Sequence, residues 1–399
     1  MANKKGANRA DSTLFAKINS LQEEAEKAIC FSVCLTTKGQ TEAIVEASLD
    51  ELSELANTAG AEVLAKIYQK RAKIDSRYYI GAGKLEEIKV LAEQVGANCL
   101  ICDDELSPAQ LRNIEEFTQM KIVDRSLLIL DIFAKRAKSS EGKLQVALAQ
   151  AKYRLPRIQF MQGFNSRLAG GIGTRGPGES LKETDRRHIQ ARINTLQQKL
   201  VELGRKRQIV REQRRKSALT IAVVGYTNAG KSSLINRLCK SDLYAEDKVF
   251  ATLDPACRHL WLEDLSCDCL LIDTVGFIRK LPHHLVEAFK STLEEAAQAD
   301  FLLLVLDVAD VQAEAELDVV LSLLEEIGAS HLPRVYVANK FDEFNYDLSQ
   351  VDSSLLAKLH ALSFDDKSLF FTSVKEQRGL NELKAALQAK LKKILQKNN

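Results

Sequence analysis

The N-terminal third of the chain alternates short apolar runs with amphipathic stretches. The apolar runs predict strands at residues 29–35, 61–67 and 97–102. The amphipathic stretches predict helices at residues 49–59, 84–95 and 107–118. Ser107 suits the N-cap of the last helix, and Pro108 suits its first turn. Strands that alternate with helices are typical of a small α/β domain, which we place at residues 29–125 after a polar tail at 1–28.

The middle of the chain changes to apolar residues at three- and four-residue spacing. This spacing runs through residues 127–155, interrupted only by Glu141, and resumes at 189–203. Such seams predict two long helices that pack antiparallel. Residues 162–178, which lie between them, include six glycines and predict irregular structure. We therefore expect a helical hairpin with a Gly-rich tip at residues 126–216.

Strands, loops and helices again follow one another in the last part of the chain. The predicted strands lie at residues 219–224, 269–273, 301–307, 334–339 and 369–373, and a final helix at 380–395. This order is typical of a doubly wound α/β domain, which we place at residues 217–399. In such a domain the loops at the carboxyl ends of the strands hold the ligand.

The charge of the chain is unevenly distributed. The net charge is +2, but residues 135–216 contain 21 Lys and Arg against 6 Asp and Glu, a net +15, so the remainder carries −13. A basic segment between acidic flanks favours a polyanionic partner, with RNA as the first candidate. The alternative is a solvated helical face with counter-charges nearby.

Composition excludes several classes of protein. No apolar run approaches the roughly 20 residues that cross a bilayer, and the first 28 residues lack the apolar core of a signal peptide. We therefore expect a cytoplasmic protein without a membrane span. Cys99 and Cys102 form a C-x-x-C inside an apolar run with no second pair at zinc-finger spacing. We interpret them as small buried hydrophobic residues rather than as metal ligands or a redox pair.

The first chemical motif follows the first strand of the C-terminal domain. Residues 225–232 match G-x-x-x-x-G-K-S and precede a helix. The glycines let backbone N–H groups surround phosphates, and the helix N-terminus adds its dipole. Lys231 is expected to reach the β- and γ-phosphates, and the Ser232 hydroxyl to hold Mg²⁺. The motif therefore predicts a P-loop.

Two later segments are expected to complete the phosphate and metal site. Asp273 ends the second strand and is expected to join the Mg²⁺ shell, and the Gly276 N–H is expected to contact the γ-phosphate. Thr252 lies in a polar segment between these motifs. We assign it by position to the first switch, where it would bond Mg²⁺ and the γ-phosphate.

The motif Asn339, Lys340, Phe341, Asp342 follows another apolar strand and predicts guanine specificity. A carboxylate accepts from both N1–H and the 2-amino group of guanine, and adenine offers no such donor pair. Residues 372–375, Thr-Ser-Val-Lys, come at the end of the last strand and are expected to reach the guanine carbonyl through backbone N–H groups. Five motifs in this order predict a GTPase. The expected nucleotide-binding residues are Gly225, Tyr226, Thr227, Asn228, Ala229, Gly230, Lys231, Ser232, Ser233, Phe250, Ala251, Thr252, Asp273, Thr274, Val275, Gly276, Asn339, Lys340, Asp342, Ser373, Val374 and Lys375. The expected catalytic residues are Lys231, Thr252 and Gly276, and the expected metal ligands are Ser232, Thr252 and Asp273.

These motifs resemble the translation-factor-related GTPases, and the wider chain is similar to the HflX family from about residue 29 to the end. The resemblance is carried by residues 273–295, which look like the family's second switch and following helix, and by the Gly-rich residues 170–179 with residues 185–187. It implies an N-terminal α/β domain, a helical hairpin and a G domain that acts on the large (50S) ribosomal subunit. Family members are linked to splitting or rescuing ribosomes under stress.

The resemblance also implies the partners: GTP and GDP, and the large ribosomal subunit with its rRNA, bound by a monomer. Arg167 and Arg175 are the cations of the hairpin tip and the expected RNA contacts. Asn228 is similar to the P-loop Asn with which some GTPases hold K⁺, so K⁺ is a candidate cofactor beside Mg²⁺. Phe277 stands where Ras-like GTPases have a water-orienting Gln, which predicts slow hydrolysis without a partner.

Two other functions remain open from sequence alone. One is an RNA-modification GTPase whose N-terminal part handles tRNA, although no motif for its cofactor fold or catalytic Cys is found. The other is a protein-binding signalling switch that acts without RNA, which the basic segment disfavours. Residues 81–84, Gly-Ala-Gly-Lys, precede a helix and predict either a tight turn or a second phosphate site.

Overall fold

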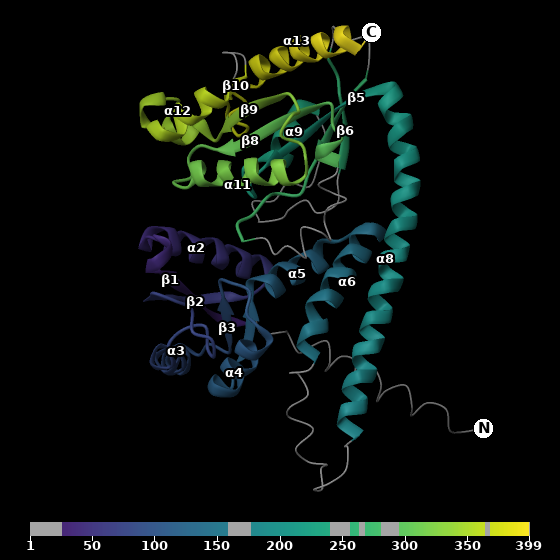
Figure 1. Cartoon of the computed structure of the whole chain (residues 1–399). Coiled ribbons are helices and arrows are strands. Elements are labelled where there is room, and N and C mark those ends of the chain that lie inside the picture. The colour runs from purple at the N-terminus through teal and green to yellow at the C-terminus, as the bar shows by residue number, and fades with distance from the viewer. Residues whose placement is uncertain are drawn as a thin grey trace, which may run out of the picture. The chain divides into compact units, whose positions relative to one another are not determined.

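The computed structural model describes residues 26–158, 177–239, 256–262, 268–280, 295–363 and 368–398. The chain forms two compact units, residues 1–125 and 126–399. Each unit contains its own sheet (Figure 1). No helix among these residues is both long enough and apolar enough to cross a membrane.

The first unit is a four-stranded parallel sheet in the order β2-β1-β3-β4. Its strands are β1 (Lys27–Leu35), β2 (Glu62–Arg71), β3 (Cys99–Cys102) and β4 (Lys121–Asp124), and its helices are α2 (Glu42–Ala59), α3 (Ala82–Val95) and α4 (Pro108–Thr118). Helix α2 covers one face of the sheet, and α3 and α4 cover the other (Figure 1). The alternation of strands with helices is therefore confirmed.

The start of α4 follows its local sequence. Ser107 Oγ accepts from the Gln110 N–H at 3.2 Å, and Gln110 Oε1 accepts from the Ser107 N–H at 3.0 Å. This reciprocal pair satisfies two N–H groups that the first helical turn leaves open. The predicted cap at Ser107 is confirmed.

The helical region contains a break that the sequence pattern does not predict. Helices α5 (Arg125–Arg136) and α6 (Ser140–Arg154) replace the single helix expected at residues 127–155. Ser139 lies in extended backbone, and its Oγ accepts from the Gly142 N–H at 2.9 Å. The prediction of one helix is wrong because a serine that can cap a new helix interrupts a continuous seam.

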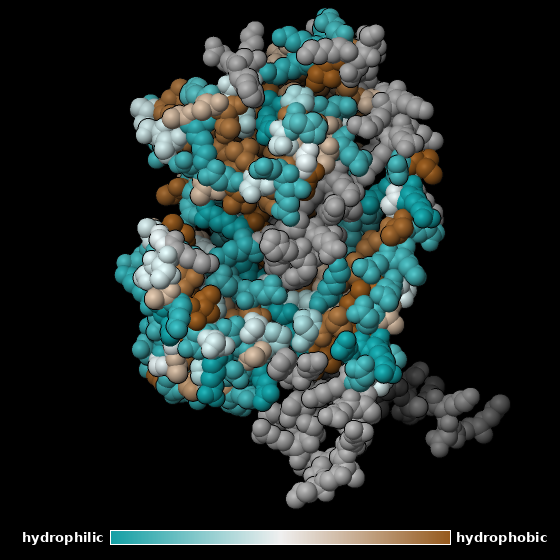
Figure 2. Space-filling model, in the orientation of Figure 1, coloured by the Kyte–Doolittle hydropathy of each residue, from teal (hydrophilic) through white to brown (hydrophobic). Residues whose placement is uncertain are grey.

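Helix α8 (Pro177–Ser217) is 41 residues long and packs along α6. Leu148 and Ala151 of α6 are buried against Ile193 and Leu196 of α8, so the predicted packing of two seams is confirmed. A line of apolar residues runs along α8 between hydrophilic ones in Figure 2. Because α8 begins at Pro177, the last two residues of the stretch predicted to be irregular are helical. Residues 162–176 lie outside the described part of the chain.

The second sheet has six strands in the order β10-β9-β8-β5-β7-β6, parallel except for β6 against β7. The strands are β5 (Ala218–Gly225), β6 (Ala256–Leu260), β7 (Asp268–Asp273), β8 (Phe301–Asp307), β9 (Arg334–Asn339) and β10 (Leu369–Phe371). The helices are α9 (Lys231–Cys239), α11 (Ala313–Glu326), α12 (Ser353–Leu362) and α13 (Leu380–Asn398). The five predicted strands are confirmed, and β6 is an addition. The carboxyl ends of β5, β7, β8 and β9 meet at one edge, where the motifs lie.

Candidate functional site

The P-loop connects central strand β5 to α9 in a tight path. A Cβ on Gly225 would lie 2.1 Å from the Val305 carbonyl oxygen of β8, and one on Gly230 would lie 2.4 Å from Asn339 Nδ2. Gly230 also has φ +91°, and Asn228 at the crest of the loop has φ +63°. Larger residues cannot make these approaches, so the two glycines hold the loop flat against the sheet edge.

Lys231 is buried with its ammonium group inside this loop. Its Nζ donates to the Tyr226 carbonyl oxygen at 2.6 Å, and the residue is only 7% exposed. Burial lowers the pKa of Lys231 to about 8, while the carboxylates of Asp273 and Glu316 act in the opposite direction. A desolvated ammonium gains most from an anionic partner, so this lysine is suited to phosphate.

The expected metal side chains lie together at the end of β7. Ser232 Oγ donates to Asp273 Oδ2 at 2.7 Å, and Asp273 is fully buried. The Thr274 hydroxyl donates to the Val223 carbonyl at 2.7 Å and fixes the strand end beside β5. A hydroxyl and a carboxylate are the hard oxygen ligands that Mg²⁺ prefers, so Ser232 and Asp273 fit the ion. When bound, Mg²⁺ supplies charge that neutralises the β- and γ-phosphates.

The segment after β7 lies directly on the P-loop. A Cβ on Gly276 would lie 2.7 Å from Thr227 Cγ2 and 3.0 Å from Lys231 Nζ, so Gly276 borders the lysine. The Phe277 N–H donates to the Gly225 carbonyl at 3.1 Å, and the Phe277 carbonyl accepts from the Thr227 N–H at 2.8 Å. Phe277 is 2% exposed. Its ring is therefore a buried anchor of this segment.

Asn339 joins three loops at the sheet edge. Its Nδ2 donates to the Ala229 carbonyl of the P-loop at 3.0 Å. Its Oδ1 accepts from the Thr372 hydroxyl and from the Val374 N–H, both at 3.3 Å. The P-loop, the loop after β9 and the loop after β10 are thus held in one arrangement.

The charged residues of the base motif have partners of their own. Lys340 Nζ lies 2.7 Å from Asp307 Oδ2. Burial raises the pKa of Asp307, and Lys340 opposes that rise. The Asp342 side chain is 9% exposed, and its nearest cation among the described residues is Lys375 Nζ at 4.0 Å. A shielded carboxylate with only a distant cation can accept from the paired donors of guanine.

Most of the predicted nucleotide residues converge at this edge: 225–233, 273–276, 339–342 and 373–375. Phe250, Ala251, Thr252, Arg167 and Arg175 lie outside the described residues. The sequence analysis missed Asp307 and Glu316. Asp307 ends a predicted strand and could have been found by that position, whereas nothing in the helical pattern of α11 marks Glu316.

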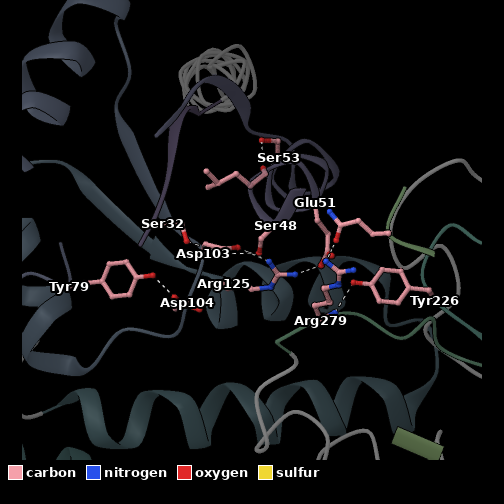
Figure 3. Close-up of polar contacts among 12 residues, drawn as sticks. Ser32, Ser48, Glu51, Ser53, Tyr79, Asp103, Asp104, Arg125, Tyr226 and Arg279 are labelled. Carbon is pink, nitrogen blue, oxygen red and sulfur yellow. Dashed lines mark hydrogen bonds and ion pairs between the residues drawn. The ribbon is translucent and has the colours of Figure 1, made fainter. Parts of the chain in front are cut away.

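The first unit has a separate buried cluster at the end of β3. Asp103, fully buried, accepts from the hydroxyls of Ser32 at 3.2 Å and Ser48 at 2.8 Å, and from Arg125 Nη1 at 2.8 Å (Figure 3). Arg125 also pairs with Glu51. The cluster joins β1, α2 and β3 to the first residue of α5 and so closes this end of the sheet.

The other candidate features of the first unit have local partners. The Gly81 N–H donates to Gln69 Oε1 at 2.8 Å, and Lys84 Nζ lies 2.7 Å from Glu87. Cys99 and Cys102 are buried in β3, and burial raises the pKa of Cys99 to about 12. A thiol held protonated in this way behaves as a small hydrophobic residue.

The fold and this site define a P-loop GTPase, an enzyme that hydrolyses GTP. Residues 220–340 match the family described as 50S ribosome-binding GTPase, and residues 46–134 and 136–214 match those described as GTP-binding GTPase N-terminal and GTP-binding GTPase Middle Region. The GTPase HflX of Caldanaerobacter subterraneus subsp. tengcongensis is 51% identical over 326 residues, which cover 82% of this chain and 74% of the relative. This chain belongs to the HflX family of GTPases.

Two further comparisons agree with this assignment. The GTPase HflX of Escherichia coli is 45% identical over 295 residues, which cover 74% of this chain and 69% of the relative. The crystal structure of SsGBP in complex with GDP is 27% identical, with a TM-score of 0.51 over 91% of this chain and 97% of that one. The likeness therefore extends over both units and not only over the G domain.

Proposed function

We propose that this GTPase binds the large ribosomal subunit in its GTP form and leaves it after hydrolysis, splitting or rescuing ribosomes in the cytoplasm under stress. The proposal rests on one observation, the basic exposed surface of α8. This surface, called here the α8 basic face, consists of the exposed cations Arg186, Arg187, Arg192, Lys199 and Arg205. Exposed Lys and Arg side chains along a helix can neutralise nucleic-acid phosphates.

The packing of α8 explains why this face is available to a partner. Ile193 and Leu196 fill the contact with α6, and they lie on the turns that also carry Arg192 and Lys199. The apolar side of α8 is therefore buried against α6, while the neighbouring cations remain exposed to solvent. Among the described residues, Arg187 forms an ion pair with the exposed Glu183 at 3.2 Å, and such surface pairs are weak.

The family match supports a ribosomal rather than a general RNA partner. The match over residues 220–340 carries the description 50S ribosome-binding GTPase. Residues 46–134 and 136–214 match the N-terminal and middle regions of GTP-binding GTPases. The resemblance of residues 170–179 to the family's hairpin tip points to a functional site on the large subunit. Arg167 and Arg175 are then the proposed RNA contacts of the tip.

Two cations are proposed for the nucleotide site. Ser232 and Asp273 would hold Mg²⁺, with Thr252 as the third side chain. Asn228 is exposed at the crest of the P-loop with φ +63°, and its amide oxygen is the proposed ligand for K⁺. Dependence of the turnover rate on K⁺ over Na⁺, lost in Asn228→Ala, tests the second cation.

Co-sedimentation with ribosomal subunits tests the proposed function. The full chain is incubated with subunits and a non-hydrolysable GTP analogue, and we expect it to travel with the large subunit. The double variant Arg192→Glu, Lys199→Glu should lose this association and still bind GDP. The matched control, Lys392→Glu with Lys393→Glu on α13, reverses two exposed charges elsewhere and should bind as the unmodified protein does. Equal binding by both double variants would refute docking through α8.

A further inference from the structure

Tyr226 makes a contact that its place in the P-loop motif does not require. The residue is 3% exposed, and its hydroxyl accepts from the Arg279 N–H at 2.9 Å (Figure 3). The Arg279 guanidinium in turn donates from Nη1 to Gln312 Oε1, at the residue that precedes α11. A chain of contacts thus runs from the P-loop through Arg279 to α11.

Residues 276–279 occupy a donor that a P-loop offers to phosphates, because the Thr227 N–H donates to the Phe277 carbonyl at 2.8 Å. Within the P-loop itself, Lys231 Nζ donates to the Tyr226 carbonyl at 2.6 Å. Backbone N–H groups of this loop and its lysine are the groups that cradle nucleotide phosphates. Residues 276–279 in this arrangement therefore compete with a terminal phosphate for the Thr227 N–H.

The Arg279 guanidinium is held by Gln312, but not all of its N–H groups have a hydrogen-bond acceptor in the described part of the chain. Arg279 Nη2 is buried, and no acceptor among the described residues lies within hydrogen-bond distance of it. A buried guanidinium N–H without an acceptor costs free energy, which Gln312 offsets only in part. Among the described residues, the segment is held by specific bonds to Thr227, Tyr226 and Gln312, and a ligand with higher affinity for another arrangement would shift it.

We propose that Tyr226 sets the relative affinity of the site for GTP and GDP. Its hydroxyl latches residues 276–279 over the P-loop through Arg279, and Gln312 acts as a positioning residue for Arg279. A γ-phosphate has to displace the Phe277 carbonyl from Thr227 and draw the Gly276 N–H toward itself, so it must open the latch. GDP has no γ-phosphate and leaves the latch closed. The Tyr226 and Gln312 contacts therefore favour GDP over GTP, because a ligand shifts an equilibrium only by its differential affinity for the two arrangements.

Removal of one hydroxyl tests this proposal. Affinities for a non-hydrolysable GTP analogue and for GDP are measured on the same preparation of Tyr226→Phe. We expect the ratio of the two affinities to shift about three- to tenfold toward the GTP analogue, the effect of one hydrogen bond. Tyr336→Phe is the matched control, because Tyr336 is also 3% exposed and lies on β9 of the same unit. An unchanged ratio in Tyr226→Phe, or a shift toward GDP, would overturn the proposal.

A second variant tests whether both contacts act through Arg279. Gln312→Met keeps the length of the side chain and removes the acceptor, and we expect its ratio to shift in the same direction. In the double variant the two shifts should be less than additive, because each alone already loosens Arg279. Fully additive shifts, or a Gln312→Met ratio equal to that of the unmodified protein, would contradict a shared latch.

Discussion

The Glu141 carboxylate of α6 lies 2.7 Å from the Arg207 guanidinium of α8, at the point where an acidic residue interrupts the apolar seam. The two side chains are 20% and 24% exposed. Glu141 is close to the start of α6, and Arg207 is close to the end of α8. The pair therefore fixes the antiparallel register of the two helices, as a single polar pair in a seam can do.

Breaking this pair should loosen the hairpin. We expect Glu141→Ala to lower the free energy of unfolding by about 1–3 kcal/mol, because it removes a partner from a mostly buried cation. Glu141→Leu should cost less, since it continues the apolar seam. Denaturant unfolding measures both variants. Glu183→Ala removes the exposed pair with Arg187 and is the control, with no measurable change expected. Equal effects of Glu141→Ala and Glu183→Ala would contradict a special role for the Glu141–Arg207 pair.

Guanine selectivity should depend on the Asp342 carboxylate. Asp342→Asn should weaken GTP binding by roughly two to three orders of magnitude, since an amide cannot accept from both guanine donors. The variant should gain preference for xanthosine triphosphate. Asp347→Asn changes an exposed carboxylate five residues away and should leave GTP binding intact. Equal affinity of the unmodified protein for ATP and GTP would contradict the role of Asp342 in guanine selectivity.

Nucleotide affinity should fall as pH rises above about 8. Burial lowers the pKa of Lys231 from 10.5 to about 8. In the nucleotide-free protein, Lys231 is therefore protonated below pH 8 and mostly neutral above it. Phosphate binding favours the charged lysine, so above pH 8 the protein must take up a proton to bind, and the affinity should drop by up to about tenfold per pH unit. GDP titrations between pH 7 and 9 measure the slope. The same slope in Lys231→Met would assign it to another group.

Hydrolysis by the free protein should be slow and should accelerate on the large subunit. The phenyl ring of Phe277 has no group that can donate or accept a hydrogen bond to the attacking water. The ring is also buried, and the Phe277 backbone is bonded to the P-loop. Single-turnover assays with and without large subunits test this expectation. Rapid turnover in Na⁺ buffer by the protein alone, unchanged by subunits, would refute dependence on a partner.

Binding to ribosomes should weaken steeply with salt. Each phosphate neutralised by the α8 basic face releases counterions, so the logarithm of the binding constant should fall linearly with the logarithm of salt concentration. Deleting residues 170–178 should impair the effect on ribosomes and spare GDP binding. If this deletion leaves both ribosome binding and splitting unchanged, the Gly-rich stretch is only a connector.

Five strands of the G domain were predictable because each is a largely apolar run, and four of them are followed by a motif. Residues 301–307 and 334–339 match β8 and β9 residue for residue, since strands buried on both faces tolerate few polar residues. Strand β6 was missed because Ala256–Leu260 shows neither an apolar run nor alternation. It is held by pairing with β7, which is a non-local interaction that no local pattern reports.

The motifs of the site were predictable from the sequence, but the hydrogen bonds between its distant residues were not. The P-loop residues and Asp273 can be found because their spacing is typical of a nucleotide-binding motif. The contact between Tyr226 and Arg279 joins residues 53 positions apart, and that of Arg279 with Gln312 joins residues 33 apart. Such pairs arise from how the sheet edge folds together, so a pattern read along the chain cannot reveal them.

Helix α8 ends at Ser217, and β5 begins at the next residue, with no linker between them. At 1.5 Å per residue its 41 residues span about 60 Å, so the helix is a stiff lever whose near end is the strand that carries the P-loop. A rotation of one degree at that junction displaces the far end by about 1 Å. A force that a partner applies to the far end of α8 would therefore be transmitted to the P-loop through the covalent junction of α8 with β5. Binding at the far end of the helix would then be felt at the phosphate-binding loop as a torque on β5.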